Sequence, residues 1–116
     1  VLLTANNTPL SFDVGDIDDD GKFDIALLSN ASTFHLYKNR VNIGGNIDAN
    51  AFELVVSFTG TPNATTLLAD LNEDGKPELI GINGTVAVDV YNNQNTQVGV
   101  INASTFAPKV AFTVNT

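Results

Sequence analysis

Apolar residues recur along this chain in short runs, and segments rich in glycine, asparagine and serine separate the runs. Several runs alternate apolar and polar residues with a period of two, as residues 34–37 and 86–91 do, which is typical of half-buried strands. No segment keeps apolar residues at helical spacing over three turns. The pattern therefore predicts an all-β protein made of short antiparallel strands.

The predicted strands form two consecutive sets of four. In each set an acidic turn joins the first two strands, a short turn follows, and a looser loop leads to the fourth strand. The first set is expected at residues 11–15, 23–28, 34–37 and 52–58. The second set is expected at residues 65–69, 78–82, 86–91 and 106–114.

The two sets are copies of one repeat, offset by 54 residues (Asp16 corresponds to Asp70). The match continues without a gap through glycine, aromatic and amide positions. The matching pairs include Gly21 and Gly75, Tyr37 and Tyr91, Asn39 and Asn93, Phe52 and Phe106, and Phe58 and Phe112. Repeats of this length with four antiparallel strands each are typical of β-propeller blades.

This interpretation divides the chain into three parts. Residues 8–61 form a first propeller blade and residues 62–116 a second. Residues 1–7 resemble the end of a fourth strand, so we expect them to be a partial outer strand of a preceding blade. Two blades cannot close a propeller, which needs about four to eight. We therefore expect further blades as partners, either in the same polypeptide, of which this chain would be a piece, or in a homo-oligomer.

Each acidic turn reads D-x-[DN]-x-D-G-x-x-[DE], which suits a hard divalent cation, calcium above all. Positions one, three, five and nine offer side-chain oxygens, position seven offers a backbone carbonyl, and glycine at position six allows a sharp turn. We expect two calcium ions, one per repeat. The predicted metal-binding residues are Asp16, Asp18, Asp20, Lys22, Asp24, Asp70, Asn72, Asp74, Lys76 and Glu78.

Three other interpretations of the turns are weaker. The calcium loop of a helix–loop–helix hand needs a glutamate at position twelve, which is Leu27 or Gly81 here. A plain solvated acidic turn would have no reason to repeat the full ligand spacing. Magnesium prefers fewer protein ligands and keeps its waters.

The formal net charge of −8 argues against nucleic acid and anionic membranes as partners. Nine of the 13 acidic residues lie in the two turns, so bound cations would cancel much of this charge. The chain has no cysteine and no apolar run near the roughly 20 residues of a membrane span, so we expect no disulfides and no membrane insertion.

No residue pattern indicates catalysis. His35 is the single histidine and lacks a nucleophilic serine or cysteine context, so a structural role is expected. Tyr37 and Tyr91 occupy matching places and are expected in the core, although a lectin could stack a sugar on one of them. We therefore expect that the protein is not an enzyme and has no catalytic or organic-cofactor site.

The motifs resemble the FG-GAP/VCBS repeat family over nearly the whole chain. The resemblance is carried by residues 14–26 with Tyr37 and Asn39, and by residues 69–79 with Tyr91 and Asn93. Such repeats build seven-bladed β-propellers in integrin α subunits, in many secreted bacterial proteins and in some fungal lectins. The chain lacks the Phe-Gly and Gly-Ala-Pro segments of the integrin form, so the simpler bacterial or lectin form is the better comparison.

The resemblance implies calcium in the loop between the first two strands of each blade, at the residues named above. It also implies a secreted or cell-surface protein with a protein or glycan ligand. The leading hypothesis is a non-catalytic, calcium-stabilised module for extracellular recognition or adhesion. The alternatives are a calcium-dependent lectin and the accessory propeller of a secreted polysaccharide-degrading enzyme.

Overall fold

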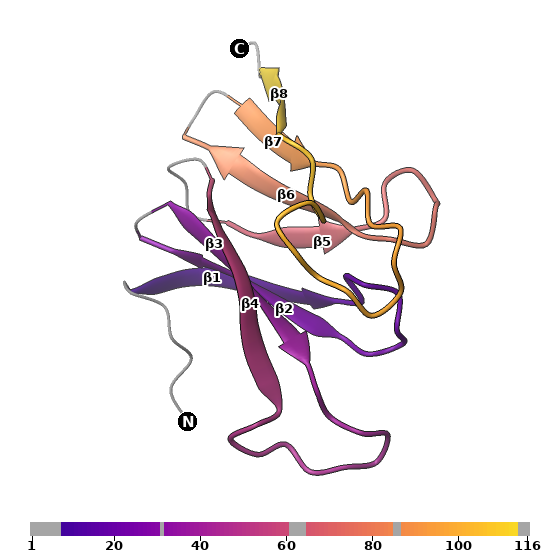
Figure 1. Cartoon of the computed structure of the whole chain (residues 1–116). Helices are drawn as coiled ribbons and strands as arrows, with labels where there is room; N and C mark the ends of the chain where they lie inside the picture. The colour runs from indigo at the N-terminus through magenta and orange to yellow at the C-terminus, as the bar shows by residue number, and fades with distance from the viewer. Residues whose placement is uncertain (1–7, 31, 61–64, 85–86, 114–116) are drawn as a thin grey trace.

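A computed structural model describes residues 8–30, 32–60, 65–84 and 87–113. Within these residues the chain forms two four-stranded antiparallel sheets and no helix (Figure 1). The first sheet contains, in spatial order, β1 (Pro9–Gly15), β2 (Asp24–Ser29), β3 (Thr33–Asn39) and β4 (Phe52–Thr59). The second contains β5 (Leu67–Ala69), β6 (Glu78–Asn83), β7 (Ala87–Tyr91) and β8 (Val110–Thr113). The prediction of an all-β fold with two sets of four antiparallel strands is confirmed.

The two sheets use the same strand register. Leu28 pairs with Phe34 between β2 and β3, and the corresponding Ile82 pairs with Val88 between β6 and β7. Because a slip of one residue would turn every side chain to the opposite face, equal registers give both repeats the same inward and outward positions. The internal repeat seen in the sequence is therefore also a repeat of structure.

The fourth strand differs between the sheets. In the first sheet β4 begins at Phe52, which pairs with Asn39. The corresponding Phe106 forms only an isolated bridge with Asn93, and β8 begins four residues later, at Val110. Pro108 lies in this gap and has no N–H to donate to a strand ladder, which accounts for the shorter strand. The predicted partial strand at residues 1–7 lies outside the described residues.

The hydrophobic core lies between the two sheets. It contains the buried residues Ile17, Ala26, Leu28, Phe34, Leu36, Leu79, Tyr91 and Ile101. Tyr91 of β7 contacts two aromatic rings of the first sheet, with ring centroids 5.6 Å from Phe34 and 5.7 Å from Phe58. Each buried aromatic ring removes about 150–250 Å² from water, so this cluster contributes much of the attraction between the sheets.

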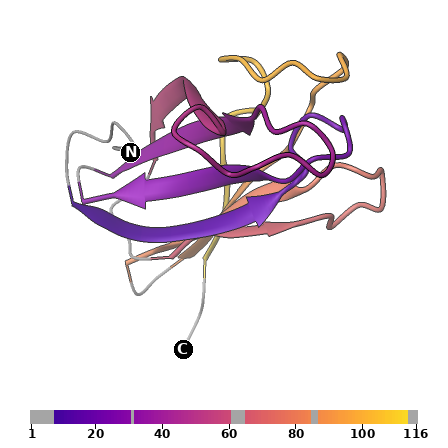
Figure 2. The same cartoon turned by 90° about the horizontal axis from the view of Figure 1, so that it is seen from below.

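The sheets are also joined by polar contacts between β1 and β5, which lie side by side in Figures 1 and 2. The N–H of Leu68 donates to Oδ2 of Asp13 at 2.8 Å, and the N–H of Thr66 donates to Oγ of Ser11 at 2.9 Å. Side chains of β1 thus satisfy backbone donors in β5 and in the residue before it, where no strand ladder of the described residues joins the two sheets.

One face of the second sheet has no cover within the described residues. Ile17 and Leu28 are fully buried between the sheets, whereas the corresponding Leu71 and Ile82 are 56% and 47% exposed. Phe58 is half-buried, whereas the corresponding Phe112 is 58% exposed. The residues that pack the first sheet against the second therefore recur on the second sheet as an exposed apolar face.

No described helix is long and apolar enough to cross a membrane.

Candidate metal centre

Two acidic loops occupy matching places in the sheets: residues 16–24 join β1 to β2, and residues 70–78 join β5 to β6. The first aspartate of each loop holds the turn. Asp16 accepts the N–H of Asp20 at 3.1 Å and that of Gly21 at 2.8 Å. Asp70 accepts the two corresponding N–H groups at 3.2 and 2.8 Å. The repeated motif therefore folds into the same hydrogen-bonded loop twice.

The backbone of the loops bends twice into the left-handed region. Gly21 and Gly75 have φ of 86° and 87°, as expected for the glycine of the motif. Asp19 and Glu73 also have φ of 61°, which is uncommon outside glycine and was not expected from the sequence. Both of these side chains are exposed.

The last acid of each loop closes it by accepting the N–H of the second loop residue. Asp24 is fully buried, and its two oxygens accept the N–H groups of Ile17 and Asn39, each at 2.9 Å. Glu78 is also buried, and its Oε2 accepts the N–H of Leu71 at 2.7 Å. Its other oxygen, Oε1, is buried without a hydrogen-bond partner. Both acids thus hold the loop closed through hydrogen bonds and place a carboxylate inside it.

The first loop gathers three carboxylates. Oxygens of Asp16, Asp18 and Asp24 lie within 4.8 Å of one another. Asp18 is fully buried, and its Oδ1 has no hydrogen-bond partner. Two carboxylates about 5 Å apart repel by roughly 3 kcal/mol at an effective dielectric of about 20. A set of clustered oxygens with an unsatisfied buried member fits a hard divalent cation.

Asp20 is not part of this cluster, and it binds a lysine. Lys38, at the end of β3, donates to Oδ2 of Asp18 and, at 3.0 Å, to Oδ2 of Asp20. Asp20 also accepts the N–H of Lys22 at 2.9 Å. Sequence reasoning did not single out Lys38. The available signal was a difference between the two repeats, since the residue that corresponds to Lys38 is Asn92.

The carboxyl groups respond to this environment. Burial raises the pKa of Asp24 to about 6, and the charges of Asp18 and Asp20 add to the effect. Burial also raises the pKa of Asp18, against the opposing influence of Lys38. For Asp20, burial is outweighed by hydrogen bonds from Lys38 and Lys22, so its pKa is lowered. An additional positive charge in the loop would therefore stabilise the ionised forms of the buried acids.

The second loop has the same bonds but a different setting. Asn72 stands where the first loop has Asp18, and residues 70–75 are exposed. Asn72 Oδ1 and Asp70 Oδ1 both accept the N–H of Asp74, at 3.3 and 3.2 Å. Lys76 donates its N–H to Asp74 Oδ1 at 2.9 Å and its Nζ to the carbonyl of Asn95 at 2.6 Å.

The first loop is covered by the second repeat. Asn93 donates its side-chain N–H to the carbonyl of Ile17 at 2.9 Å, and the N–H of Gly99 donates to the carbonyl of Asp18 at 2.9 Å. These bonds explain why Ile17 and Asp18 are buried, whereas the corresponding Leu71 and Asn72 are exposed. Sequence reasoning did not find this cover, because it depends on contacts between repeats.

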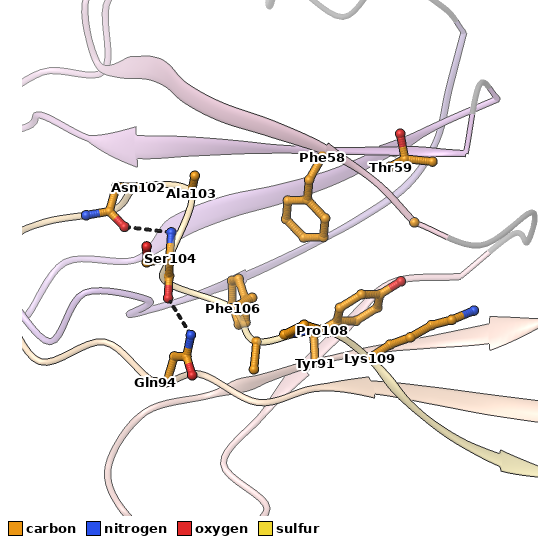
Figure 3. Close-up of a pocket in the computed structure, with 12 residues that line it drawn as sticks. Phe58, Thr59, Tyr91, Gln94, Asn102, Ala103, Ser104, Phe106, Pro108 and Lys109 are labelled. Carbon is orange, nitrogen blue, oxygen red and sulfur yellow. Dashed lines mark hydrogen bonds between the residues drawn. The ribbon is translucent and has the colours of Figure 1, made fainter.

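A cleft of about 500 Å³ opens between the end of β4 and the segment that connects β7 to β8 (Figure 3). Phe58 lies on one wall, and Tyr91 and Phe106 lie on the other. Amide and hydroxyl groups border the cleft at Gln94 and Ser104, and Gln94 donates to the carbonyl of Ser104 at 3.0 Å. The cleft therefore combines aromatic walls with a polar rim.

His35 and the matching tyrosines lie in buried positions. The His35 ring lies 2.8 Å from Oγ of Ser57 and 3.3 Å from Oγ of Ser29, and burial lowers its pKa. Tyr37 is buried, and Tyr91 belongs to the core between the sheets. The expected core positions of both tyrosines are confirmed.

Comparisons of the chain with protein-family models, curated proteins and solved structures found no match. No relative therefore supplies a function for the two loops or the cleft. The support for a function comes from the residues of the chain and their geometry.

Proposed function

We propose that this chain is a non-catalytic, calcium-stabilised part of a β-propeller that serves extracellular recognition or adhesion. The observation that carries the proposal is the buried Oδ1 of Asp18, which has no hydrogen-bond partner and belongs to a cluster with Asp16 and Asp24. Burying an ionised oxygen without a partner is costly, and a bound cation would remove that cost.

In the proposed site the first loop holds calcium through Asp16, Asp18 and Asp24, with Asp20 and the Lys22 carbonyl as the remaining predicted ligands. The second loop holds calcium through Asp70, Asn72, Asp74, the Lys76 carbonyl and Glu78. The identical hydrogen bonds at the first and fifth positions of the two loops support one function for both. The ions would offset carboxylate repulsion and lock each turn between its two strands.

The exposed face of the second sheet supports the propeller part of the proposal. Leu71, Ile82 and Phe112 repeat the positions that bury the first sheet against the second, so a further repeat can pack on them in the same way. The partner is a further blade, in the same polypeptide or in another copy of this chain. A secreted or cell-surface location would supply the calcium.

The test is thermal unfolding with and without calcium. At a calcium concentration about tenfold above a site Kd of about 10⁻⁴–10⁻³ M, each ion contributes about 1.4 kcal/mol, so two ions raise the melting temperature by about 10 °C. Magnesium at the same concentration is expected to have a smaller effect. A melting temperature that chelation leaves unchanged would refute calcium stabilisation.

A matched pair of variants localises the ion. Asp16→Asn removes a charge from the cluster and is expected to lower calcium affinity of the first loop by at least about tenfold. Asp19→Asn removes the same charge from an exposed side chain of the same loop and keeps a left-handed position that asparagine adopts readily. Equal losses in the two variants would indicate a diffuse charge effect and no defined site.

The cleft favours a carbohydrate as the second candidate ligand. Aromatic walls with amide and hydroxyl groups at the rim suit the apolar and polar faces of a sugar. Screening the calcium-loaded protein on a glycan array tests this function. Binding that Phe106→Ala abolishes would establish a lectin, whereas an array without signal would leave recognition of a protein as the function.

A further inference from the structure

A lysine lies inside the first acidic loop. Lys38 is buried at the end of β3, and its ammonium group contacts Oδ2 of Asp18 and Oδ2 of Asp20. These contacts satisfy one oxygen of Asp18 and leave Oδ1 buried without a partner. The loop thus already contains one cation beside the oxygens that would bind a second.

The second repeat differs at the same two places. The residue corresponding to Asp18 is Asn72, and the residue corresponding to Lys38 is the exposed Asn92. Every other charged position of the two loops matches in sign. The matching pairs are Asp16 and Asp70, Asp19 and Glu73, Asp20 and Asp74, Lys22 and Lys76, and Asp24 and Glu78. The first repeat therefore contains one more acid and one more base than the second, and the two loops present the same formal charge to an incoming ion.

We propose that Lys38 is an internal counter-ion of the first loop: it holds the loop closed without metal, and its ammonium group must be displaced when a divalent cation binds there. This inference rests on the proposed calcium binding. The second loop has no such charge, because Asn92 stands in its place, so its hydrogen bonds hold it closed without help from an internal cation. The first loop is therefore expected to be the more stable of the two without metal, and the second to gain more from calcium.

The physical reason is competition for the same carboxylates. Asp18 is fully buried, so its charge must be compensated from within the protein or by a bound ion. An ammonium group a few ångströms from a divalent cation repels it, and this repulsion is only partly screened at a buried position. Removing the ammonium charge should therefore strengthen calcium binding and weaken the metal-free loop.

The experiment is a calcium titration by calorimetry in a background where Asp70→Ala weakens the second loop. Lys38→Asn is expected to raise calcium affinity of the first loop about tenfold or more and to lower the melting temperature in chelator. Lys38→Arg keeps the charge and serves as the matched control, with affinity close to that of the parent. The double variant Asp18→Asn/Lys38→Asn carries the residues of the second repeat. Its calcium affinity and its melting temperature in chelator should both return toward the parent values.

The outcomes separate the two proposals. If Lys38→Asn folds only with calcium, as circular dichroism would show, the counter-ion role is supported directly. If the parent binds calcium and Lys38→Asn binds it equally or more weakly, Lys38 does not compete with the ion, and this inference fails while the proposed function stands. If neither parent nor variants bind calcium at either loop, the proposed function fails first and the competition with it.

Discussion

Asp24 shows how one residue serves both the loop and the cluster. Its two oxygens accept the N–H groups of Ile17 and Asn39, so it closes the loop and ties it to β3. Each oxygen keeps a second lone pair that can face the oxygens of Asp16 and Asp18. Burial raises its pKa to about 6, because the metal-free protein disfavours an ionised carboxylate at this position.

This pKa predicts a pH dependence for the metal-free protein. The folded-state pKa of about 6 lies above the ordinary value of 3.8, so the folded state holds the proton more tightly. Asp24 therefore favours folding at low pH, and this advantage is lost as pH rises from about 4 to about 6, by a difference of about 3 kcal/mol. Urea unfolding from pH 4 to 7 in metal-free buffer checks the expectation.

The control for the pH dependence is Asp24→Asn, which cannot ionise. The unfolding free energy of the parent minus that of this variant should fall as pH rises across the same range. A difference that stays constant from pH 4 to 7 would show that Asp24 does not titrate there. Calcium should reduce the dependence in the parent, because the ion compensates the carboxylate.

Among the elements, β1 and β5 have a special role because no strand ladder joins the two sheets. The Leu68 N–H of β5 is satisfied by Asp13 of β1, and the Thr66 N–H by Ser11. Asp13 also accepts the N–H of Val14 at 2.9 Å, which fixes the orientation of its carboxylate. Side chains of β1 thus add two hydrogen bonds to the apolar contacts that hold the sheets together.

Replacing Asp13 with alanine should destabilise the protein by about 1–3 kcal/mol, because the half-buried Leu68 N–H loses its acceptor. Asp13→Asn keeps an acceptor oxygen and is expected to remain near the parent value. Chemical unfolding gives both numbers, and amide exchange at Leu68 reports the lost bond directly. Equal stability of the alanine and asparagine variants would show that the contact contributes nothing to the pairing of the sheets.

The whole molecule has an apolar face that the described residues leave open. Val110 and Phe112 of β8 are 56% and 58% exposed, and Ile82 of β6 lies on the same sheet. The corresponding residues of the first sheet pack against the second, so the open face has the shape of an interface between repeats. A face of this kind attracts a further repeat or a second copy of the chain.

We therefore expect Phe112→Lys to reduce self-association of the chain without a loss of stability, because the side chain is more exposed than buried. Ile43→Lys is the matched control, since Ile43 is fully exposed in the loop between β3 and β4. Sedimentation velocity over a range of concentrations checks both variants. Self-association that Phe112→Lys leaves unchanged, or that Ile43→Lys reduces equally, would place the contact elsewhere.

The sequence predicted the elements well because its signals are local. Strand alternation and the glycines at the sixth loop position act within a few residues, and the constant offset of 54 residues shows that the same signals occur twice, so the two sheets and their loops follow from them. The shortened β8 has a local cause at Pro108, yet its consequence depends on pairing with β7. The left-handed backbone conformations of Asp19 and Glu73 were not predicted from their residue types, since the closed loops that contain these residues impose the conformation.

By itself, the sequence determined which acidic and amide residues each loop contains and how they are spaced, because spacing is a property of neighbouring residues. Only the tertiary structure decided how these oxygens are used. It buried Asp18 under Gly99, placed Lys38 between Asp18 and Asp20, and left the second loop exposed. The physical reason is that burial and charge compensation depend on contacts between strands and between repeats, which are distant along the chain and become neighbours only in the folded protein.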